Sequence, residues 1–353
     1  GDEEEDDILD IPFYIYCIGQ SAFERCTGLK RVRFHIGYNY QNEGFSRTEI
    51  GIFNRSFYGS SVSSVSFMYY NNYRYYYPVR YNAFSNCQNL IKGIYIEGGT
   101  FEGYTFESCN NLIGGITISG GSFGDCTFAN CQRLSGAEII MISDGQFGQS
   151  TFANCANLRG GVAISGGTFG DYTFANCSSL RGGLSIGGDM SNYAFINCVS
   201  LGPDINNVTL YLSGSLGRHC FDGCTSFGGI LDLIGSASIG ESAFEDFNMP
   251  FTLRAMYSSS ASVGRRAFYH CSLVGDLDIS GIEEIGNEAF ANCPNQLRSL
   301  TLYPSTSCGI NVFANTVFAN ESSGGIVMLT AYLGSKFNQY TFRDVKGLNR
   351  LTL

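Results

Sequence analysis

Apolar and polar positions follow one pattern that returns every 22 to 24 residues through the middle of the chain. The pentapeptide Thr-Phe-Ala-Asn-Cys occurs at residues 127–131, 151–155 and 173–177, and a near copy, Thr-Phe-Glu-Ser-Cys, occupies residues 105–109. Self-similarity at a fixed period of this length indicates a solenoid, in which each repeat forms one coil that stacks on its neighbours.

The residues of a single repeat predict the parts of one coil. Phe106, Cys109 and Leu112 are spaced three apart, which favours a short, 3₁₀-like turn with one buried side. Glycines at 114–115 are expected to end this turn, because glycine accepts a left-handed backbone conformation. The segment 116–118 alternates apolar, polar and apolar residues, as a strand with one buried face does. The pattern therefore predicts a mainly β solenoid with short helical turns and one parallel β-sheet face.

Phenylalanines that anchor the repeat continue over most of the chain, and we count about fourteen coils of 21–28 residues. The anchors are Phe23, Phe57, Phe84, Phe106, Phe128, Phe152, Phe174, Phe195, Phe221, Phe244, Phe268, Phe290, Phe318 and Phe342. Residues 38–83 are irregular, with Ser60 where a cysteine is expected. Residues 1–10 carry seven acids of a chain whose net charge is −10, so we expect a disordered leader there. Residues 11–353 are predicted to form a single solenoid domain.

Residues 18–29 follow the pattern I-G-x-x-A-F-x-x-C-x-x-L, which is specific enough to compare with known repeat families. Its opening recurs at 239–244, at 263–268 with valine in first place, and at 285–293. The chain resembles the BspA-like leucine-rich repeat family over nearly all residues past the leader. The resemblance implies a leucine-rich-repeat solenoid. It also implies a cell-surface protein that adheres to host or matrix proteins, or to other cells.

Ten of the fourteen cysteines lie three residues after an anchor phenylalanine, which predicts a ladder of buried thiols that behave as small apolar side chains. Its central members are Phe106, Cys109, Phe128, Cys131, Phe152, Cys155, Phe174 and Cys177. The cysteines outside this position, Cys17, Cys126, Cys220 and Cys308, are the better candidates for disulfide pairing or oxidation. The chain has no C-x-x-C motif, and neither a metal site nor a cofactor is predicted. An asparagine before the cysteine of many repeats is expected to satisfy backbone groups at the coil corners.

Sequence motifs of catalysis and nucleic-acid binding are missing from the chain. The three histidines, His35, His219 and His270, leave a Ser-His-Asp arrangement open, but no G-x-S-x-G, P-loop or H-E-x-x-H motif is present. The 21 basic residues form no basic run, which argues against nucleic acid as a partner. No apolar run is long enough to cross a bilayer. We therefore expect no enzyme activity.

Binding residues are expected on the solvent side of the strands, where the middle residue of each strand points outward. These middle residues are Arg33, Tyr95, Thr117, Ala163, Ser185, Tyr211, Asp232, Asp278 and Thr301, with His35 and Glu97 just after two of the strands. Most of this set is expected to be ordinary solvated strand positions. From it we single out Arg33, His35, Tyr95, Glu97 and Tyr211 as candidate contacts.

A tyrosine-rich segment is the second candidate binding site, because tyrosine gives large contact area at low entropy cost. Its candidate residues are Tyr69, Tyr70, Tyr73, Arg74, Tyr75, Tyr76, Tyr77, Arg80 and Tyr81. The alternative is that these tyrosines only cover the edge of the first coils.

The sequence, with the resemblance, predicts a non-catalytic cell-surface or secreted module that binds a protein ligand, such as a host matrix protein or another surface protein. The location implied is extracellular, with a signal peptide already removed. The alternative is a structural stalk that holds another domain and has no ligand of its own. The strand-like end at 351–353 has no polar capping repeat, so either the chain is a fragment or this strand is protected in another way.

Overall fold

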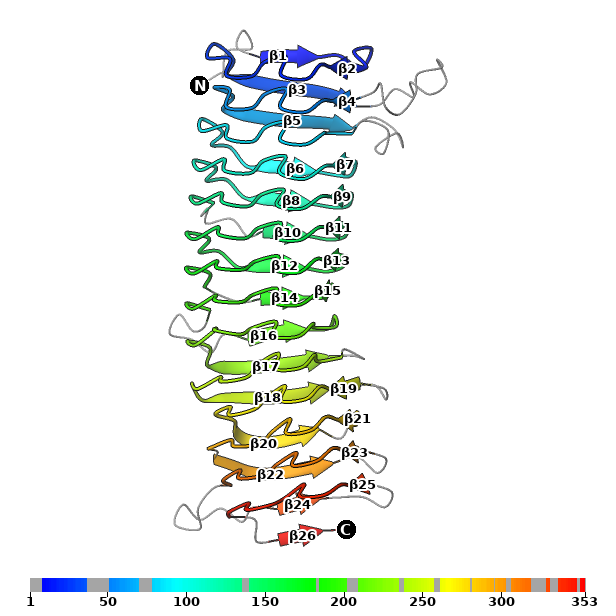
Figure 1. Cartoon of the computed structure of the whole chain (residues 1–353), viewed down its shortest axis with the longest axis vertical. Coiled ribbons are helices and arrows are strands. Elements are labelled where there is room, and N and C mark those ends of the chain that lie inside the picture. The colour runs from blue at the N-terminus through cyan, green and yellow to red at the C-terminus, as the bar shows by residue number, and fades with distance from the viewer. Residues whose placement is uncertain are drawn as a thin grey trace. The chain divides into compact units, whose positions relative to one another are not determined.

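The structure, a computed structural model, forms parallel β-solenoid coils that follow one another in chain order (Figure 1). It describes residues 8–36, 51–69, 78–134, 140–181, 184–201, 209–234, 238–256, 261–279, 281–294, 296–302, 306–318, 328–330, 336–347 and 350–352. The chain divides into two compact units, Gly1–Leu180 and Arg181–Leu353. The predicted solenoid class is confirmed in both. That residues 11–353 form a single domain stays a prediction.

The first unit contains two lines of parallel strands. The longer strands are β1 (Ile8–Ile11), β3 (Arg31–Ile36), β5 (Ser64–Tyr69), β6 (Ile94–Ile96), β8 (Ile116–Ile118), β10 (Ile140–Ile142) and β12 (Val162–Ile164). The short ones are β2 (Cys17–Ile18), β4 (Gly51–Ile52), β7 (Thr100–Phe101), β9 (Ser122–Phe123), β11 (Gln146–Phe147) and β13 (Thr168–Phe169). The long strands pair in the orders β1-β3-β5 and β6-β8-β10-β12. The short strands form a second sheet line that the sequence analysis had not included.

The second unit repeats this plan. Its longer strands are β14 (Leu184–Ile186), β16 (Thr209–Leu212), β17 (Gly229–Ile234), β18 (Phe251–Met256), β20 (Val274–Ile279), β22 (Gln296–Leu302), β24 (Met328–Thr330) and β26 (Arg350–Thr352). Its short strands are β15 (Asp189–Met190), β19 (Ala261–Val263), β21 (Ile282–Ile285), β23 (Ser307–Cys308) and β25 (Lys336–Phe337). The long strands pair as β14-β16-β17-β18 and β20-β22-β24-β26.

The turn between the two strand lines is not the 3₁₀-like helix that the spacing predicts, and the described residues contain no helix. Single bonds of the 3₁₀ type do form, for example from Leu134 N to Cys131 O at 3.0 Å. Left-handed residues interrupt them: Cys126 has φ 56° and Asn130 has φ 60°. Asparagine tolerates this conformation better than most residues, which explains its place before the cysteine. The exposed Asn154 amide also donates to Asn130 Oδ1 at 3.0 Å, so the asparagines form a side-chain ladder.

The anchor phenylalanines form a stack of parallel rings in each unit. In the first unit Phe128 and Phe152 have ring centroids 5.2 Å apart and planes within 4°. The first stack runs through Phe23, Phe57, Phe84, Phe106, Phe128, Phe152 and Phe174. The second runs through Phe195, Phe221, Phe244, Phe268, Phe290, Phe313 and Phe342. Phe313 therefore takes the place that the sequence analysis gave to Phe318, which is buried elsewhere and bridges to Leu297.

The predicted thiol ladder is present, and its members are more than small apolar residues. Cys109, Cys131, Cys155 and Cys177 are fully buried. Each thiol also points at the backbone carbonyl of the anchor phenylalanine one coil back, as in Cys155 Sγ to Phe128 O at 3.4 Å. In the coil of Phe313 a threonine stands at this position, and Thr316 Oγ1 makes the same bond to Phe290 O at 2.7 Å. A small side chain with a hydrogen-bond donor thus fills this position in most coils; in the coil of Phe244 the buried Phe247 stands there instead.

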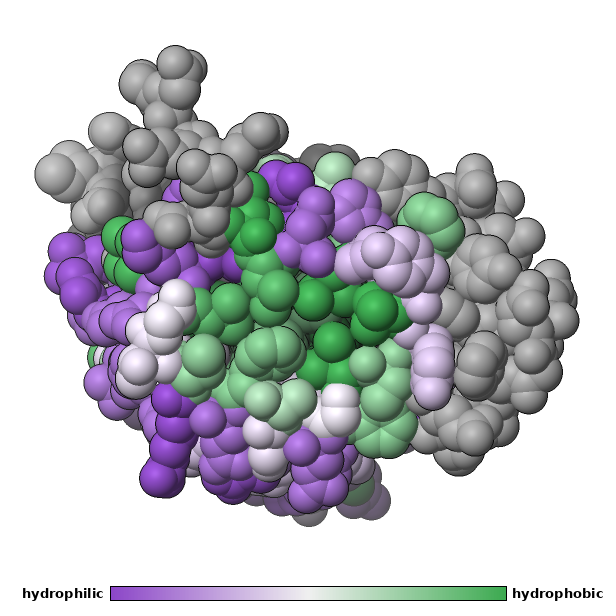
Figure 2. Space-filling model, turned by 90° about the horizontal axis from the view of Figure 1, so that it is seen from above, coloured by the Kyte–Doolittle hydropathy of each residue, from purple (hydrophilic) through white to green (hydrophobic). Residues whose placement is uncertain are grey.

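The N-terminal end of the first unit shows how much a neighbouring coil contributes to the burial of apolar residues. Figure 2 looks at this end, where hydrophobic residues lie in the middle and hydrophilic ones surround much of them. The first-coil residues Phe23, Cys26 and Leu29 are only half-buried, whereas Phe106 and Cys109 inside the unit are fully buried. A solenoid coil covers its apolar face only through its neighbours.

Two segment boundaries differ from the sequence expectation. Residues 8–10 of the expected leader belong to β1, which pairs with β3; residues 1–7 lie outside the described residues. The irregular segment 38–83 includes a regular coil at 51–69, in which Phe57 stacks on Phe23 and Phe84. Ser60 takes the cysteine position, as predicted, with its hydroxyl 3.6 Å from Cys87 Sγ.

We expect the thiols to label with iodoacetamide in an order that follows burial. None of the fourteen cysteines, all of them described, forms a disulfide, and only Cys17, Cys26 and Cys126 are partly exposed. These three should react first. Burial raises the pKa of Cys17 and Cys126, so their labelling should accelerate as the pH rises through the alkaline range. Peptide mass spectrometry would measure this. Equally fast labelling of Cys131 in the folded protein would contradict the buried ladder.

Candidate functional site

The long strands of each unit present a regular outward face. In the first unit the outward residues Tyr95, Thr117, Met141 and Ala163 lie in direct register across β6, β8, β10 and β12. Tyr95 and Met141 are exposed. The Tyr95 hydroxyl donates to Glu97 Oε1 at 3.1 Å. Of the predicted contacts, Tyr95 and Glu97 thus lie together on this face.

Arg33 and His35, the other predicted contacts of this unit, lie on β3 beside Asp10 of β1. His35 Nε2 is 2.6 Å from Asp10 Oδ1, and Arg33 Nη1 is 3.9 Å from Asp10 Oδ2. Asp10 had been assigned to the leader, so the sequence did not anticipate this cluster. It ties the first two long strands together on their solvent side.

Only the ends of the tyrosine-rich segment fall within the described residues, and residues 70–77 lie outside them. Tyr69 ends β5, and its hydroxyl donates to the Gly98 carbonyl at 2.9 Å. Arg80 pairs with Glu102 at 2.7 Å, and Tyr81 is exposed at the corner that follows. The described ends therefore hold coil corners, while the binding role of the segment stays a prediction.

In the second unit, three outward residues form a cluster that we call the Asp232 site: Tyr211, Asp232 and Arg254. They are in direct register on β16, β17 and β18. Tyr211 is 46% exposed, and the side chain of Arg254 is 52% exposed. Asp232, although it points to the solvent side, has only 7% of its side chain exposed. The predicted contact Tyr211 thus lies beside a nearly buried carboxylate.

The carboxylate of this site is incompletely satisfied. Asp232 Oδ1 accepts no hydrogen bond from any described residue, and its ion-pair contact, Arg254 Nε, is 3.9 Å away. A buried acceptor without a hydrogen bond costs about 1–3 kcal/mol. The alternation of apolar and polar residues predicts from sequence that Asp232 points outward. The sequence does not show that Asp232 is nearly buried or that Arg254 lies beside it, because both depend on strand register.

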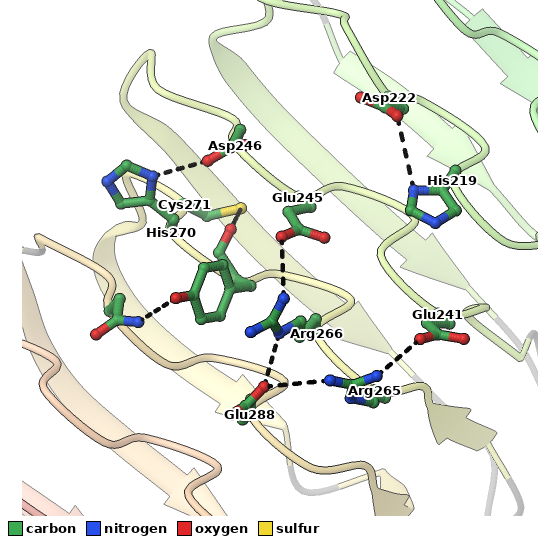
Figure 3. A network of polar contacts seen from close by, with 12 residues as sticks. His219, Asp222, Glu241, Glu245, Asp246, Arg265, Arg266, His270, Cys271 and Glu288 are labelled. Atoms are coloured by element: carbon green, nitrogen blue, oxygen red, sulfur yellow. Dashed lines mark hydrogen bonds and ion pairs between the residues drawn. The ribbon is translucent and has the colours of Figure 1, made fainter.

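A second polar cluster lies at the coil corners of the same unit (Figure 3). Arg266 Nε is 2.6 Å from Glu288 Oε2, and its guanidinium also approaches Glu245 at 3.9 Å. Arg265 links Glu241, at 3.3 Å, to Glu288, at 3.8 Å. The hydrogen bond that Arg266 donates to Glu288 raises the pKa of Arg266. These pairs join successive coils, and exposed pairs of this kind add about 0–1 kcal/mol each. They serve the stacking of coils.

Each histidine of the chain lies beside an aspartate: His35 beside Asp10, His219 beside Asp222 and His270 beside Asp246. His270 Nδ1 is 2.7 Å from Asp246 Oδ1 (Figure 3). The adjacent Cys271 turns inward, with Sγ 2.9 Å from Phe244 O. Burial raises the Cys271 pKa well above its usual value, so this thiol is a poor nucleophile.

Metal-ligating clusters and membrane-spanning helices are both missing from the part of the chain that the structure describes. No three His, Cys, Asp or Glu side chains there come together in a way that could hold a metal ion. Nor does this part contain a helix with the length and apolar character that a membrane span requires.

Stacked parallel coils with phenylalanine, thiol and leucine positions inside define the class of leucine-rich-repeat solenoids. The chain belongs to the BspA type leucine rich repeat family, whose model matches six copies over residues 7–68, 50–181 and 188–323. No curated protein matches the sequence. Among solved structures, the crystal structure of the pneumococcal vaccine antigen PcpA matches with a TM-score of 0.33 and 14% identity, covering 93% of this chain and 85% of that chain.

Proposed function

We propose that the protein is a non-catalytic, secreted or cell-surface module that binds another protein through the outward faces of its long strands. Membership of the leucine-rich repeat family supports this, because solenoids of stacked repeats commonly bind through extended faces. The observation that supports it most directly is the Asp232 site. There an exposed tyrosine and an exposed arginine flank an acceptor that lacks a hydrogen bond.

The chemistry of this site suits a protein ligand with a hydrogen-bond donor. Tyrosine and arginine are enriched among residues that dominate binding energy, and such residues lie around desolvated centres. A ligand amide, hydroxyl or ammonium group that reaches Asp232 Oδ1 would satisfy an acceptor to which none of the described residues donates. Tyr211 provides contact area next to it.

The Asp232→Ala variant separates a binding role from a structural one. The free energy of unfolding should stay the same or rise, because the substitution removes a buried acceptor without a hydrogen bond. Binding to the ligand should weaken at least about tenfold. Biolayer interferometry on a panel of immobilised extracellular matrix proteins would identify the ligand, and urea unfolding would measure stability.

Glu284→Ala is the matched control, since Glu284 is an exposed carboxylate on β21 of the same unit. It should leave both quantities nearly unchanged. Loss of stability in Asp232→Ala with unchanged binding would contradict the proposal.

A structural stalk is the alternative function. The small outward residues Thr117 and Ala163 favour it, because they offer little contact area. If no matrix protein or cell surface is bound by the wild-type chain, the stalk is the better description.

A further inference from the structure

The outward side of the second unit carries four alternating charges that we call the charged row. Its members are Asp232 on β17, Arg254 on β18, Asp276 on β20 and Arg298 on β22, each 22 residues after the one before. Acidic and basic residues therefore alternate over four successive coils. The row shares its first two members with the Asp232 site. Asp278, the next outward residue of β20, lies one step outside it.

Strand register places the first three members of the row in one line. Asp232 and Arg254 are direct partners across β17 and β18. Further along the unit, Phe251 of β18 forms a bridge with Leu273, which directly precedes β20. Arg254 and Asp276 each follow this bridge by three residues, so they stand at matching positions of neighbouring coils.

A β-bulge brings the fourth member to the row. The register between β20 and β22 shifts between Gly275 and Asp276, where β22 has one residue more than β20. The extra residue is Arg298, and its Nη2 is 3.2 Å from Asp276 Oδ2. Bulges re-aim side chains and are frequent next to functional sites. This bulge puts an exposed arginine at the end of the row.

Contacts within the chain satisfy the charges of the row only in part. Asp232 Oδ1 accepts no hydrogen bond from a described residue. The contact between Arg254 Nε and Asp232 is 3.9 Å, which is too long for a hydrogen bond, and the Arg254 side chain is 52% exposed. Asp276 and Arg298 do form a hydrogen bond, but both side chains are mostly exposed. Exposed ion pairs contribute little to folding, so a partner can share these charges at small cost.

A row of four alternating charges is complementary to itself when one copy is reversed. Read from β17 to β22 the row begins with a negative charge, and read from β22 to β17 it begins with a positive one. A two-fold axis parallel to the strands, midway between Arg254 and Asp276, places every carboxylate opposite an arginine. Asp232 then faces Arg298 of a second copy, and Arg254 faces Asp276 of that copy.

We propose that the charged row binds a second copy of this chain in this reversed orientation. The proposal rests on the proposed function, because it names the partner of the same outward face. Arg298 of the second copy supplies a donor to the Asp232 carboxylate, whose Oδ1 receives none from the described residues. Copies that run in the same direction are disfavoured, since like charges then meet. Reversed copies suit molecules displayed on two facing cells.

Sedimentation velocity of the whole chain at low salt tests the proposal. Wild type should form a reversible dimer that weakens as salt is raised, because the contacts are ionic. The acidic variant, Arg254→Glu with Arg298→Glu, makes the row uniformly negative and should raise the dimer dissociation constant at least about tenfold. The basic variant, Asp276→Arg, should also dimerise more weakly than wild type. An equal mixture of the two variants should associate more tightly than either alone, because facing charges are then mostly opposite.

Arg159→Glu with Arg181→Glu is the matched control, because it makes the same change of net charge at two exposed arginines outside the row. It should leave dimerisation unchanged, and urea unfolding should show that all variants are folded. A monomeric wild type overturns the proposal; if that monomer still binds a matrix protein, the proposed function stands. A control that weakens the dimer as much as the acidic variant overturns it too. So does a mixture that associates no better than its components.

Discussion

Replacing Phe152 by alanine is expected to lower the free energy of unfolding by about 3–5 kcal/mol, as for other fully buried phenylalanines. Phe152 is 0% exposed and stacks between Phe128, at 5.2 Å, and Phe174, at 5.0 Å. Its loss leaves a cavity between two coils whose backbones are fixed by interstrand hydrogen bonds, so the neighbouring rings cannot close the space. Urea unfolding followed by circular dichroism would measure the effect.

Phe13→Ala is the matched control for this substitution. Phe13 lies in the same unit but is 50% exposed, so its removal should change the free energy of unfolding by less than about 1 kcal/mol. If Phe152→Ala costs no more than Phe13→Ala, the stacked phenylalanines do not form the core.

The interior of the coil could be predicted because it depends on local pattern. Phe106, Cys109 and Leu112 are all fully buried, as their spacing and repetition indicate. The segment 116–118 forms β8 with buried first and last residues, as its alternation predicts. Such inward positions follow from the chain geometry of one repeat and need no knowledge of how neighbouring coils are placed.

The turn conformation was harder to predict from the sequence, because a spacing of three residues fits both a 3₁₀ turn and a turn broken by left-handed residues. The asparagine before the cysteine was the available signal, since asparagine tolerates positive φ. The sequence near the last anchor phenylalanines also contained a signal that would have given the correct assignment. Residues 313–316 read Phe-Ala-Asn-Thr, which is the repeat motif with threonine for cysteine, and this identifies Phe313 rather than Phe318.

The candidate site shows the limit of the alternation rule. The rule assigns Tyr211 and Asp232 to the outward face, and the structure confirms that assignment. It cannot tell that Asp232 is nearly buried, since this depends on which residues stand beside it. Arg254 is 22 positions away and reaches Asp232 only because the intervening coil sets their register. Exposure and pairing across coils are properties of the stack.

The close stacking of coils also explains glycines that the sequence analysis assigned to backbone freedom. Gly114 does not adopt a positive φ; a Cβ there would collide with the backbone of Gly93 in the previous coil. A glycine four residues before the anchor phenylalanine recurs for the same reason. These glycines are Gly124, Gly148 and Gly170 in the first unit, and Gly217, Gly240, Gly264, Gly286 and Gly309 in the second.

The Gly170→Ala variant is therefore expected to lose about 1–3 kcal/mol of unfolding free energy, the usual cost of overpacking. Its Cβ would lie 2.7 Å from the Gly148 carbonyl carbon and 2.8 Å from Gln149 N, and a backbone held by hydrogen bonds cannot yield. Gly120→Ala is the matched control: its nearest neighbour, Glu97 O, would be 3.5 Å away. Alanine there restricts mainly the unfolded chain, so stability should stay equal or rise by up to about 1 kcal/mol. Urea unfolding should show a loss of stability in Gly170→Ala alone, and equal losses in both variants would mean that coil spacing does not select glycine at residue 170.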